Sequence, residues 1–406
     1  MKLLRSCWMG RGLLLYRHLH PMRNHLQESA WCEISRAQIS QNLHQTLKRL
    51  PAQTRLCAVI KADAYGHGIQ NMVPLLMAQG VSHIGISSNA EARAVRDTGF
   101  AGAILRLRTA TPKEVEGALS EEVEELVGSE AGLRAIQGRL AGRELPPLHV
   151  SLNAGGMSRD GLELSTPEGR QACHNILELA AGRIVGLCTH FPSNHPAELA
   201  ENVARFQQDL AWVFANCPLR REDVLTHAGS TLTLAAGGDP QVDMMRCGAI
   251  LFGIAGPGPE FHPALTLKSQ VISIGAYPKG SSIGYDRTTV LHRDRLLASI
   301  ALGYANGYSR QLSKGAEVLI RGQKCPVMGA ISMNTIVADV TDVPGVAISD
   351  EVVAFGQQGD QEIDSQAIEQ LSGTIMADLF SDWGQRNPRI MSDAPEPIGA
   401  KVGHRD

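Results

Sequence analysis

The chain has 406 residues, which is enough for a large hydrophobic core and for two domains. Its formal net charge is −3 and 4% of its residues are aromatic, a composition that argues against a nucleic-acid-binding protein. The sequence has no run of about 18 apolar residues, and its eight cysteines form no C-x-x-C pair. We therefore expect no nucleic-acid partner, no membrane-spanning helix and no metal site.

The first 27 residues form a basic segment with five Lys and Arg side chains and no acidic one. Its apolar stretch at residues 13–16 is interrupted by Arg17. The stretch is shorter than the core of about 7–15 residues that a secretory signal needs. We expect a disordered extension on a cytoplasmic protein. The alternative is a degenerate export signal, which would place the protein in the periplasm.

The next part of the chain alternates between short apolar runs and stretches with a helical pattern. A first helix is predicted over residues 36–50 and ends at Pro51. The apolar runs that follow lie at residues 56–60, 81–86, 103–107, 123–127, 148–152, 184–189, 224–227 and 244–252. Strands that alternate with helices are typical of βαβ units and a parallel sheet. Eight such runs predict a TIM (β/α)8 barrel, although periodicity alone leaves a doubly wound sheet open.

The pattern changes near residue 257 to short alternating strands with glycine-containing turns. The predicted strands and the single predicted helix of this part lie at residues 270–274, 296–301, 316–320, 335–340, 351–355 and, for the helix, 364–376. We therefore predict an α/β protein with a barrel domain at residues 28–258 and a mostly β domain at residues 259–406.

Lys61 directly follows the first apolar run, where a buried strand would end. Burial lowers the pKa of an amine and makes its neutral form available for imine chemistry with a carbonyl. A single lysine in this position is more often a solvated strand end. The hypothesis therefore depends on what the other strands bring to the same face.

The carboxyl ends of parallel barrel strands lie on one face, where active sites of such barrels form. Several of the runs end in basic residues or glycine-rich turns, and the side chains at these ends are Arg106, Arg108, Arg159, His190, His227, Ser230 and Arg246. Each alone has an ordinary explanation as a core histidine, a paired or solvated arginine, or a turn. Together they suit a phosphate-bearing anion.

Residues 59–68, with the sequence VIKADAYGHG, resemble the signature of the alanine racemase family. The resemblance extends over nearly the whole chain from about residue 30. It implies a barrel with a β domain, pyridoxal 5'-phosphate as the cofactor and a free amino acid as the substrate. It also implies a homodimer with shared active sites.

The resemblance implies a cofactor contact at each of these positions: Lys61, Tyr65, His190, Ser230, Arg246, Gly248 and Ala249. Lys61 would carry the cofactor as an imine. Tyr65, Ser230 and the backbone of Gly248 and Ala249 would bind its phosphate. His190 would lie beside the pyridine ring.

Arg246 would face the pyridine nitrogen. A guanidinium does not readily give up a proton, so this nitrogen would remain a hydrogen-bond acceptor and the ring a weaker electron sink. Such a ring favours return of the α-proton over side reactions.

The resemblance also implies a two-base mechanism for racemisation. Lys61 would serve one face of the planar α-carbon and Tyr285 the other. Arg159 would meet the substrate carboxylate or the phenolic oxygen of the cofactor. Met333 and Tyr304 would line the substrate entrance of the neighbouring subunit.

Within the family, the chain looks more like the broad-specificity amino acid racemases than the strict alanine enzymes. Ser151 or Asn153 stands where the strict enzymes carry a lysine that is often carbamylated. The tyrosine that binds phosphate near their C-terminus falls at Gln385 or Trp383. We therefore expect alanine and further amino acids as substrates.

Two alternatives remain open from the sequence. One is a pyridoxal-phosphate barrel decarboxylase, although no segment matches its late Cys and Asp. The other is a non-catalytic pyridoxal-phosphate-binding protein. The β domain with Tyr285 and Met333 argues against it.

Overall fold

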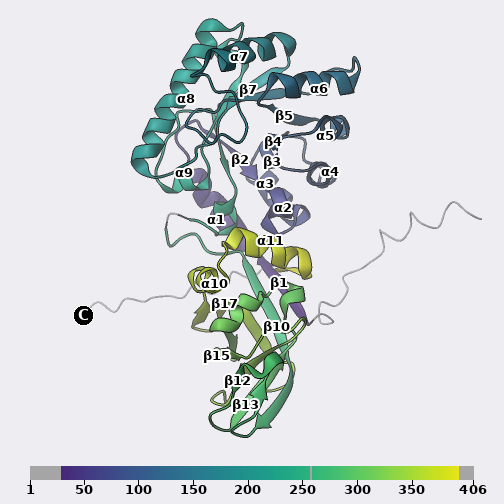
Figure 1. Ribbon diagram of the computed structural model, residues 1–406, viewed down its shortest axis with the longest axis vertical. Helices are drawn as coiled ribbons and strands as arrows, with labels where there is room; N and C mark the ends of the chain where they lie inside the picture. Colours follow the sequence, from purple (N-terminus) through teal and green to yellow (C-terminus); the bar gives the residue numbers. More distant parts are fainter. Residues whose placement is uncertain (1–28, 257, 393–406) are drawn as a thin grey trace, which may run out of the picture.

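The computed structural model describes residues 29–256 and 258–392. It forms a barrel and a β unit, stacked along the long axis of the molecule (Figure 1). The predicted extension at residues 1–27 lies outside the described residues. Within the part that is described, no helix combines the length and the apolar character needed to cross a bilayer.

The barrel is closed and its neighbouring strands are parallel, so the doubly wound alternative is wrong. The strands follow one another in chain order: β2 (Arg55–Val59), β3 (His83–Ile86), β4 (Ala103–Thr109), β5 (Val123–Val127), β6 (Leu148–Ser151), β7 (Ile184–Cys188), β8 (Leu225–His227) and β9 (Met244–Cys247). Each predicted run forms one of these strands. The last run was predicted too long, because β9 ends at Cys247 and the chain turns into the 3-10 helix η4 (Ala249–Phe252).

Helices surround the barrel (Figure 1). They and the short 3-10 turns between the strands are α1 (Arg36–Arg49), α3 (Ile69–Ala78), α4 (Asn89–Asp97), α5 (Pro112–Glu116), η2 (Leu119–Glu121), α6 (Glu130–Leu140), α7 (Pro167–Leu179), α8 (Pro196–Asn216), η3 (Arg221–Asp223) and α9 (Thr231–Ala235). Side-chain caps fix where several of them begin. At α1, the Ser35 hydroxyl accepts a hydrogen bond from the Gln38 N–H at 3.1 Å.

The β unit contains a nine-stranded sheet within the described residues. In spatial order its strands are β18 (Gln361–Ile363), β17 (Glu351–Gln358), β14 (Glu317–Ile320), β15 (Gln323–Met328), β16 (Ile336–Asp339), β13 (Arg295–Ile300), β10 (Leu265–Tyr277), β1 (Ala30–Ser35) and β19 (Arg389–Ser392). The additional pairing of β17 with β10 curls this sheet around its own core.

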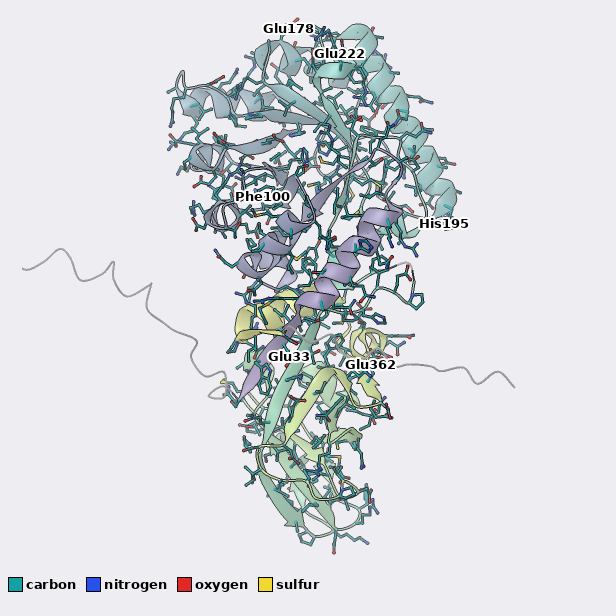
Figure 2. All side chains as sticks on the ribbon, turned by 180° about the vertical axis from the view of Figure 1, so that it is seen from behind. Glu33, Phe100, Glu178, His195, Glu222 and Glu362 are labelled. Atoms are coloured by element: carbon teal, nitrogen blue, oxygen red, sulfur yellow. The ribbon has the colours of Figure 1, made fainter. Side chains whose placement is uncertain are left out.

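The first described strand, β1, belongs to this sheet and not to the barrel, since it pairs antiparallel with β10 and parallel with β19. Glu33 of β1, labelled in Figure 2, forms an ion pair with Lys268 of β10 at 3.0 Å. The chain therefore starts in the β unit, builds the barrel and then returns. This double connection ties the two units together.

The helix predicted at residues 364–376 is wrong in its extent, because two helices are present. These are α10 (Ser365–Ser372) and α11 (Met376–Arg386). Gly373 ends α10 in a left-handed conformation, with φ of 72°. Figure 1 shows α11 between the sheet and the barrel.

Helix α11 is anchored in the core of the β unit. The rings of Phe380 and Phe355 pack edge to face at 5.4 Å, and the buried Trp383 donates its indole N–H to the Gly307 carbonyl at 3.0 Å. Helix α11 also contacts α2 (Lys61–Tyr65), the turn that begins at Lys61. A rigid element of one unit therefore supports the lysine segment of the other.

The two arginines expected at the end of the third run are bound by carboxylates. Arg106 is fully buried and forms a bidentate ion pair with Glu125, at 2.8 and 3.0 Å. Its remaining donors reach the Asn89 side-chain oxygen at 2.7 Å and a backbone carbonyl. Arg108 pairs with Glu114. The hypothesis that these two side chains help to bind an anion is therefore wrong.

Candidate active site

Lys61 follows β2 and begins a turn of unusual backbone conformation. Ala62, Asp63, Ala64 and Tyr65 have φ of 54°, 51°, 58° and 51°, so four consecutive residues with side chains are left-handed. This conformation costs about 1–2 kcal/mol for each such residue. The turn therefore needs stabilising contacts from outside itself.

Hydrogen bonds and one ion pair supply part of this stabilisation. Glu91 at the start of α4 accepts the Ala62 N–H at 2.8 Å, and Asp63 accepts the Ile69 N–H at 2.8 Å. The second oxygen of Asp63 forms an ion pair with Arg389 of β19. The turn is thus attached to the barrel helices on one side and to the β unit on the other.

Close packing of backbone against backbone completes the support. A Cβ atom on Gly66 would lie 1.9 Å from the carbonyl oxygen of Phe380 in α11. A Cβ atom on Gly384 of the same helix would lie 1.9 Å from the Gly66 oxygen. Glycine at both positions lets α11 pack directly on the lysine turn. We call this contact and the Asp63–Arg389 ion pair the lysine clamp.

The pKa of the Lys61 amine is lowered, as its position predicted, but the side chain is less buried than expected. The preceding strand is buried up to Ile60, but the Lys61 side chain is exposed in the single chain. Partial burial at the carboxyl ends of the barrel strands, a region that we call the barrel mouth, still lowers the pKa of its amine. The charge of Arg159 lowers it further, and Glu91 opposes the shift.

The structure brings the predicted basic residues together at the carboxyl ends of the strands. Burial first, and then the charges of Arg246, Arg159 and Lys61, lower the pKa of His190 to about 4. His190 is therefore neutral near pH 7, while two permanent cations lie close by. This combination produces a positive potential at the barrel mouth, which suits an anionic ligand.

Tyr65 and Gly248 meet on one side of the mouth. The Tyr65 ring packs 5.1 Å from that of Phe252, and burial raises the pKa of its hydroxyl to about 12. The hydroxyl therefore stays protonated and can donate a hydrogen bond to an anion. A Cβ atom on Gly248 would lie 2.8 Å from the Tyr65 hydroxyl. This position needs glycine.

Two short helices begin beside this contact: Ser230 is the N-cap of α9, and Ala249 is the first residue of η4. Thr231, which the sequence analysis did not single out, ties the two together. Its hydroxyl accepts the Gly248 N–H at 3.2 Å and the Ile250 N–H at 3.3 Å. The Gly248 amide expected at the phosphate is therefore already bonded within the protein.

Arg246 is held rigidly at the carboxyl end of β9. One of its terminal nitrogens donates to Nδ1 of His227 at 2.8 Å, and the other donates to the Thr189 carbonyl at 2.7 Å. These bonds fix the plane of the guanidinium. His227 is therefore a partner of Arg246, and it is fully buried.

Asn153 organises the loop that carries Arg159. Its carbonyl oxygen accepts the Ser158 N–H at 2.7 Å, and its amide donates to Glu163 at 2.7 Å. Arg159 itself is exposed. The side-chain amide of Asn153 therefore holds this loop in place.

The three predicted residues of the β unit lie on the surface of the single chain. Tyr285, Met333 and Tyr304 are 65%, 55% and 38% exposed. The backbone bonds from Tyr304 N–H to the Ser332 carbonyl, at 3.1 Å, and from Ala305 N–H to the Met333 carbonyl, at 2.9 Å, join their segments.

Tyr285 lies in η5 (Tyr285–Arg287), between the paired strands β11 (Ser282–Ile283) and β12 (Thr289–Val290). Figure 1 shows β12 far from α2, at the opposite end of the β unit. The remaining 3-10 helices of this unit are η6 (Tyr304–Asn306) and η7 (Arg310–Lys314).

The residues present fit a cofactor that carries a phosphate and an aldehyde. The mouth combines an amine of lowered pKa, permanent cations and a protonated tyrosine hydroxyl beside a glycine that leaves no room for a side chain. Within the described residues, no group of three or more His, Cys, Asp and Glu side chains could hold a metal ion.

His67, at the end of the lysine turn, makes the stability of the fold depend on pH. Burial lowers its pKa to about 4, although its Nδ1 lies 3.0 and 3.1 Å from the Tyr65 and Ala64 carbonyls. Its folded pKa lies below its unfolded value, so the unfolded chain binds more protons between pH 6.5 and about 4. Stability therefore decreases as the pH falls through this window.

We predict that wild-type protein loses about 1.5 kcal/mol more unfolding free energy than His67→Gln between pH 6.5 and 5. Urea unfolding at the two pH values measures the difference. His44→Gln, at an exposed position of α1, serves as the control and should keep the wild-type dependence. Equal pH dependence of His67→Gln and wild type would contradict the prediction.

A second prediction concerns the lysine clamp. Gly384→Ala should destabilise the protein by about 2 kcal/mol and weaken cofactor binding, because the added methyl overlaps the Gly66 carbonyl. Gly138→Ala, in the exposed part of α6 with open space around it, should instead stabilise by about 0.5–1 kcal/mol. Thermal unfolding and cofactor titration measure both. A Gly384→Ala protein as stable as wild type would show that the clamp is not tight.

The chain resembles known proteins over both units. The family profile for the alanine racemase N-terminal domain matches residues 34–256, and the profile for the C-terminal domain matches residues 264–391. A broad specificity amino-acid racemase of Aeromonas hydrophila is 42% identical over 89% of each chain. A lysine racemase of Proteus mirabilis is 38% identical over 90% of each chain.

Solved structures agree with this assignment. The alanine racemase of E. faecalis is 25% identical, with a TM-score of 0.80 over 90% of this chain and 98% of the other. The Bartonella henselae alanine racemase, solved with covalently bound pyridoxal phosphate, shares the fold at 23% identity, with a TM-score of 0.78 over 90% of this chain and 100% of the other. With profiles, relatives and fold in agreement over both units, the chain belongs to the alanine racemase family.

Proposed function

We propose that this protein is a pyridoxal 5'-phosphate-dependent racemase that interconverts the L and D forms of alanine and of further amino acids. The observation that carries the proposal is the barrel mouth. There an amine of lowered pKa, Lys61, lies among His190, Arg159 and Arg246, with Tyr65 and Gly248 at one side. The broad specificity racemases among its relatives support the same function.

Lys61 and Tyr285 are the two bases of the proposed reaction. Pyridoxal phosphate, when bound, supplies an aldehyde that condenses with amines and a ring that withdraws electrons from the α-carbon. The lowered pKa of Lys61 increases the fraction of neutral amine, which can take a proton at Nζ and return it. The Tyr285 hydroxyl serves the opposite face of the α-carbon.

Three further side chains orient the reactants. Arg246, fixed by its bonds to His227 and Thr189, would present its remaining N–H donors to the ring nitrogen. A guanidinium keeps its protons, so the ring nitrogen remains an acceptor. Arg159 binds the substrate carboxylate or the phenolic oxygen. The neutral His190 would lie beside the ring.

We further propose a head-to-tail homodimer in which the β unit of each chain completes the active site of the other. Tyr285, Tyr304 and Met333 are exposed in the single chain. Tyr285 belongs to η5, which directly precedes β12, and β12 lies far from α2 (Figure 1). A second chain that places these side chains over the barrel mouth would cover them. It would also supply the second base. A monomer would then be inactive.

The proposed substrate range includes amino acids other than alanine. Relatives named as broad specificity and lysine racemases have the same two units over about 90% of their length. Incubation with a panel of L-amino acids and chiral detection of D-products tests it. Racemisation of alanine alone would restrict the proposal to alanine, and carbon dioxide release without D-product would favour the decarboxylase alternative.

Complementation between inactive chains tests the shared site. Lys61→Ala and Tyr285→Phe should each lose racemase activity as homodimers, because each lacks one base. After mixing and subunit exchange, a dimer with one chain of each kind contains one complete site. An equal mixture should therefore recover about a quarter of the wild-type activity.

A mixture of Lys61→Ala with a Lys61→Ala/Tyr285→Phe double variant is the matched control, since it cannot assemble a complete site. Activity in the control, or none in the test mixture despite proven exchange, would contradict the shared site. Wild-type rates for homodimeric Tyr285→Phe in both directions would contradict the assignment of the second base.

A further inference from the structure

A chain of hydrogen bonds runs from Arg246 through the barrel interior to a carboxylate near its amino end. Arg246 lies 2.8 Å from Nδ1 of His227, and Nε2 of His227 lies 2.9 Å from Nδ1 of His149. Nε2 of His149 lies 2.9 Å from a carboxylate oxygen of Glu124. The four side chains come from β9, β8, β6 and β5. Both histidines are buried.

The chemistry of Arg246 and Glu124, at the two ends of this series of hydrogen bonds, allows donation in one direction only, from Arg246 towards Glu124. A guanidinium can only donate, so Nδ1 of His227 carries no proton. Neutral His227 must then carry its proton on Nε2 and donate it to Nδ1 of His149. That leaves the His149 proton on Nε2, where it is donated to Glu124. Protonating either histidine would break one of these bonds.

The surroundings support neutral, immobile rings. Burial, and then the charges of Arg246 and of nearby histidines, lower the pKa of His227 well below its usual value. The two rings meet edge to face at 4.8 Å. A Cβ atom on Gly186 would lie 1.9 Å from Nδ1 of His149, so β7 leaves space for this ring only because glycine occupies that position.

We propose that Glu124 is a positioning residue for the reaction, which acts through His149 and His227 to hold the guanidinium of Arg246. Glu124 is the second residue of β5, at the amino end of the barrel, and cannot touch a ligand at the carboxyl ends of the strands. Its side chain is 20% exposed and lines a cavity of about 520 Å³ together with Glu144 and Arg183. The inference rests on the proposed role of Arg246 at the ring nitrogen.

The physical role of Glu124 is to provide the terminal acceptor. Without it, Nε2–H of His149 loses its acceptor, and the ring can adopt its other tautomer. The His149 proton would then face the proton of His227. His227 cannot reverse in turn, because Arg246 has no acceptor to offer. Loss of the anchor therefore loosens the guanidinium.

The first experiment is nitrogen NMR of full-length protein labelled with ¹⁵N-histidine, with and without pyridoxal phosphate. The signals of the two histidines are assigned by difference from His149→Gln and His227→Gln. Both should be neutral with the proton on Nε2. A proton on Nδ1 of either one, or an imidazolium at pH 7, would overturn the proposal without any Glu124 variant.

The second experiment replaces the anchor. Glu124→Gln retains an acceptor oxygen and should keep both tautomers. In Glu124→Leu, both tautomers of each histidine should be populated. The same variant should lower kcat in both directions about tenfold, with KM within about twofold, as expected for the loss of one hydrogen bond from a carboxylate to a buried group. Glu144→Gln removes a carboxylate from the same cavity and leaves the hydrogen bonds between Arg246 and Glu124 intact. It should change neither the histidine tautomers nor kcat.

The outcomes separate this inference from the proposed function. Unchanged nitrogen shifts in Glu124→Leu would overturn the anchoring role. Changed shifts with unchanged kcat would overturn the coupling to Arg246. If wild-type protein does not racemise amino acids, the nitrogen shifts still decide whether Glu124 fixes the two tautomers.

Discussion

The lysine clamp is the constraint on which the active site depends. Four consecutive left-handed residues after Lys61 cost roughly 4–8 kcal/mol together, which is comparable to the whole stability of many proteins. The Asp63–Arg389 ion pair is partly exposed and contributes no more than about 1 kcal/mol. The remaining compensation comes from the hydrogen bonds of Glu91 and Asp63 to backbone N–H groups, from packing of α11 against Gly66, and from the buried ring of His67 between Phe252 and Phe380.

The clamp explains why both units are needed for one catalytic lysine. Helix α11 is fixed in the core of the β unit through Phe380 and Trp383, and its backbone supports the turn that follows β2. The β unit thus positions Lys61 of its own chain. In the proposed dimer, the far end of the same unit delivers Tyr285 to the other chain. In this dimer, each β unit would position Lys61 in its own chain's site and Tyr285 in the partner's site.

The architecture could be predicted from the sequence because it follows from local periodicity. Each of the eight barrel strands and the change to a β unit appear as apolar runs with characteristic spacing. The convergence of Lys61, Arg159, His190 and Arg246 follows from the rule that carboxyl ends of parallel strands share a face. The roles of the site residues came from the family resemblance and stay predictions.

Other features depend on contacts between distant segments, which periodicity does not reveal. The left-handed form of the turn after Lys61 is not apparent from the local sequence, and the turn packs against α11, more than 300 residues later. Arg106 looks like an anion-binding residue in the sequence, but in the structure its guanidinium is paired with the carboxylate of Glu125 on the neighbouring strand. The series of hydrogen bonds from Arg246 to Glu124 could be recognised only from three interatomic distances, which the sequence does not contain.

The most direct test of the central claim, two bases on opposite faces of the α-carbon, is exchange of the substrate α-proton in deuterium oxide. Wild-type protein should exchange it for deuterium in both enantiomers of alanine. Tyr285→Phe protein should exchange it in one enantiomer, through Lys61, without forming the other. Exchange in both enantiomers at wild-type rates by Tyr285→Phe would contradict the account.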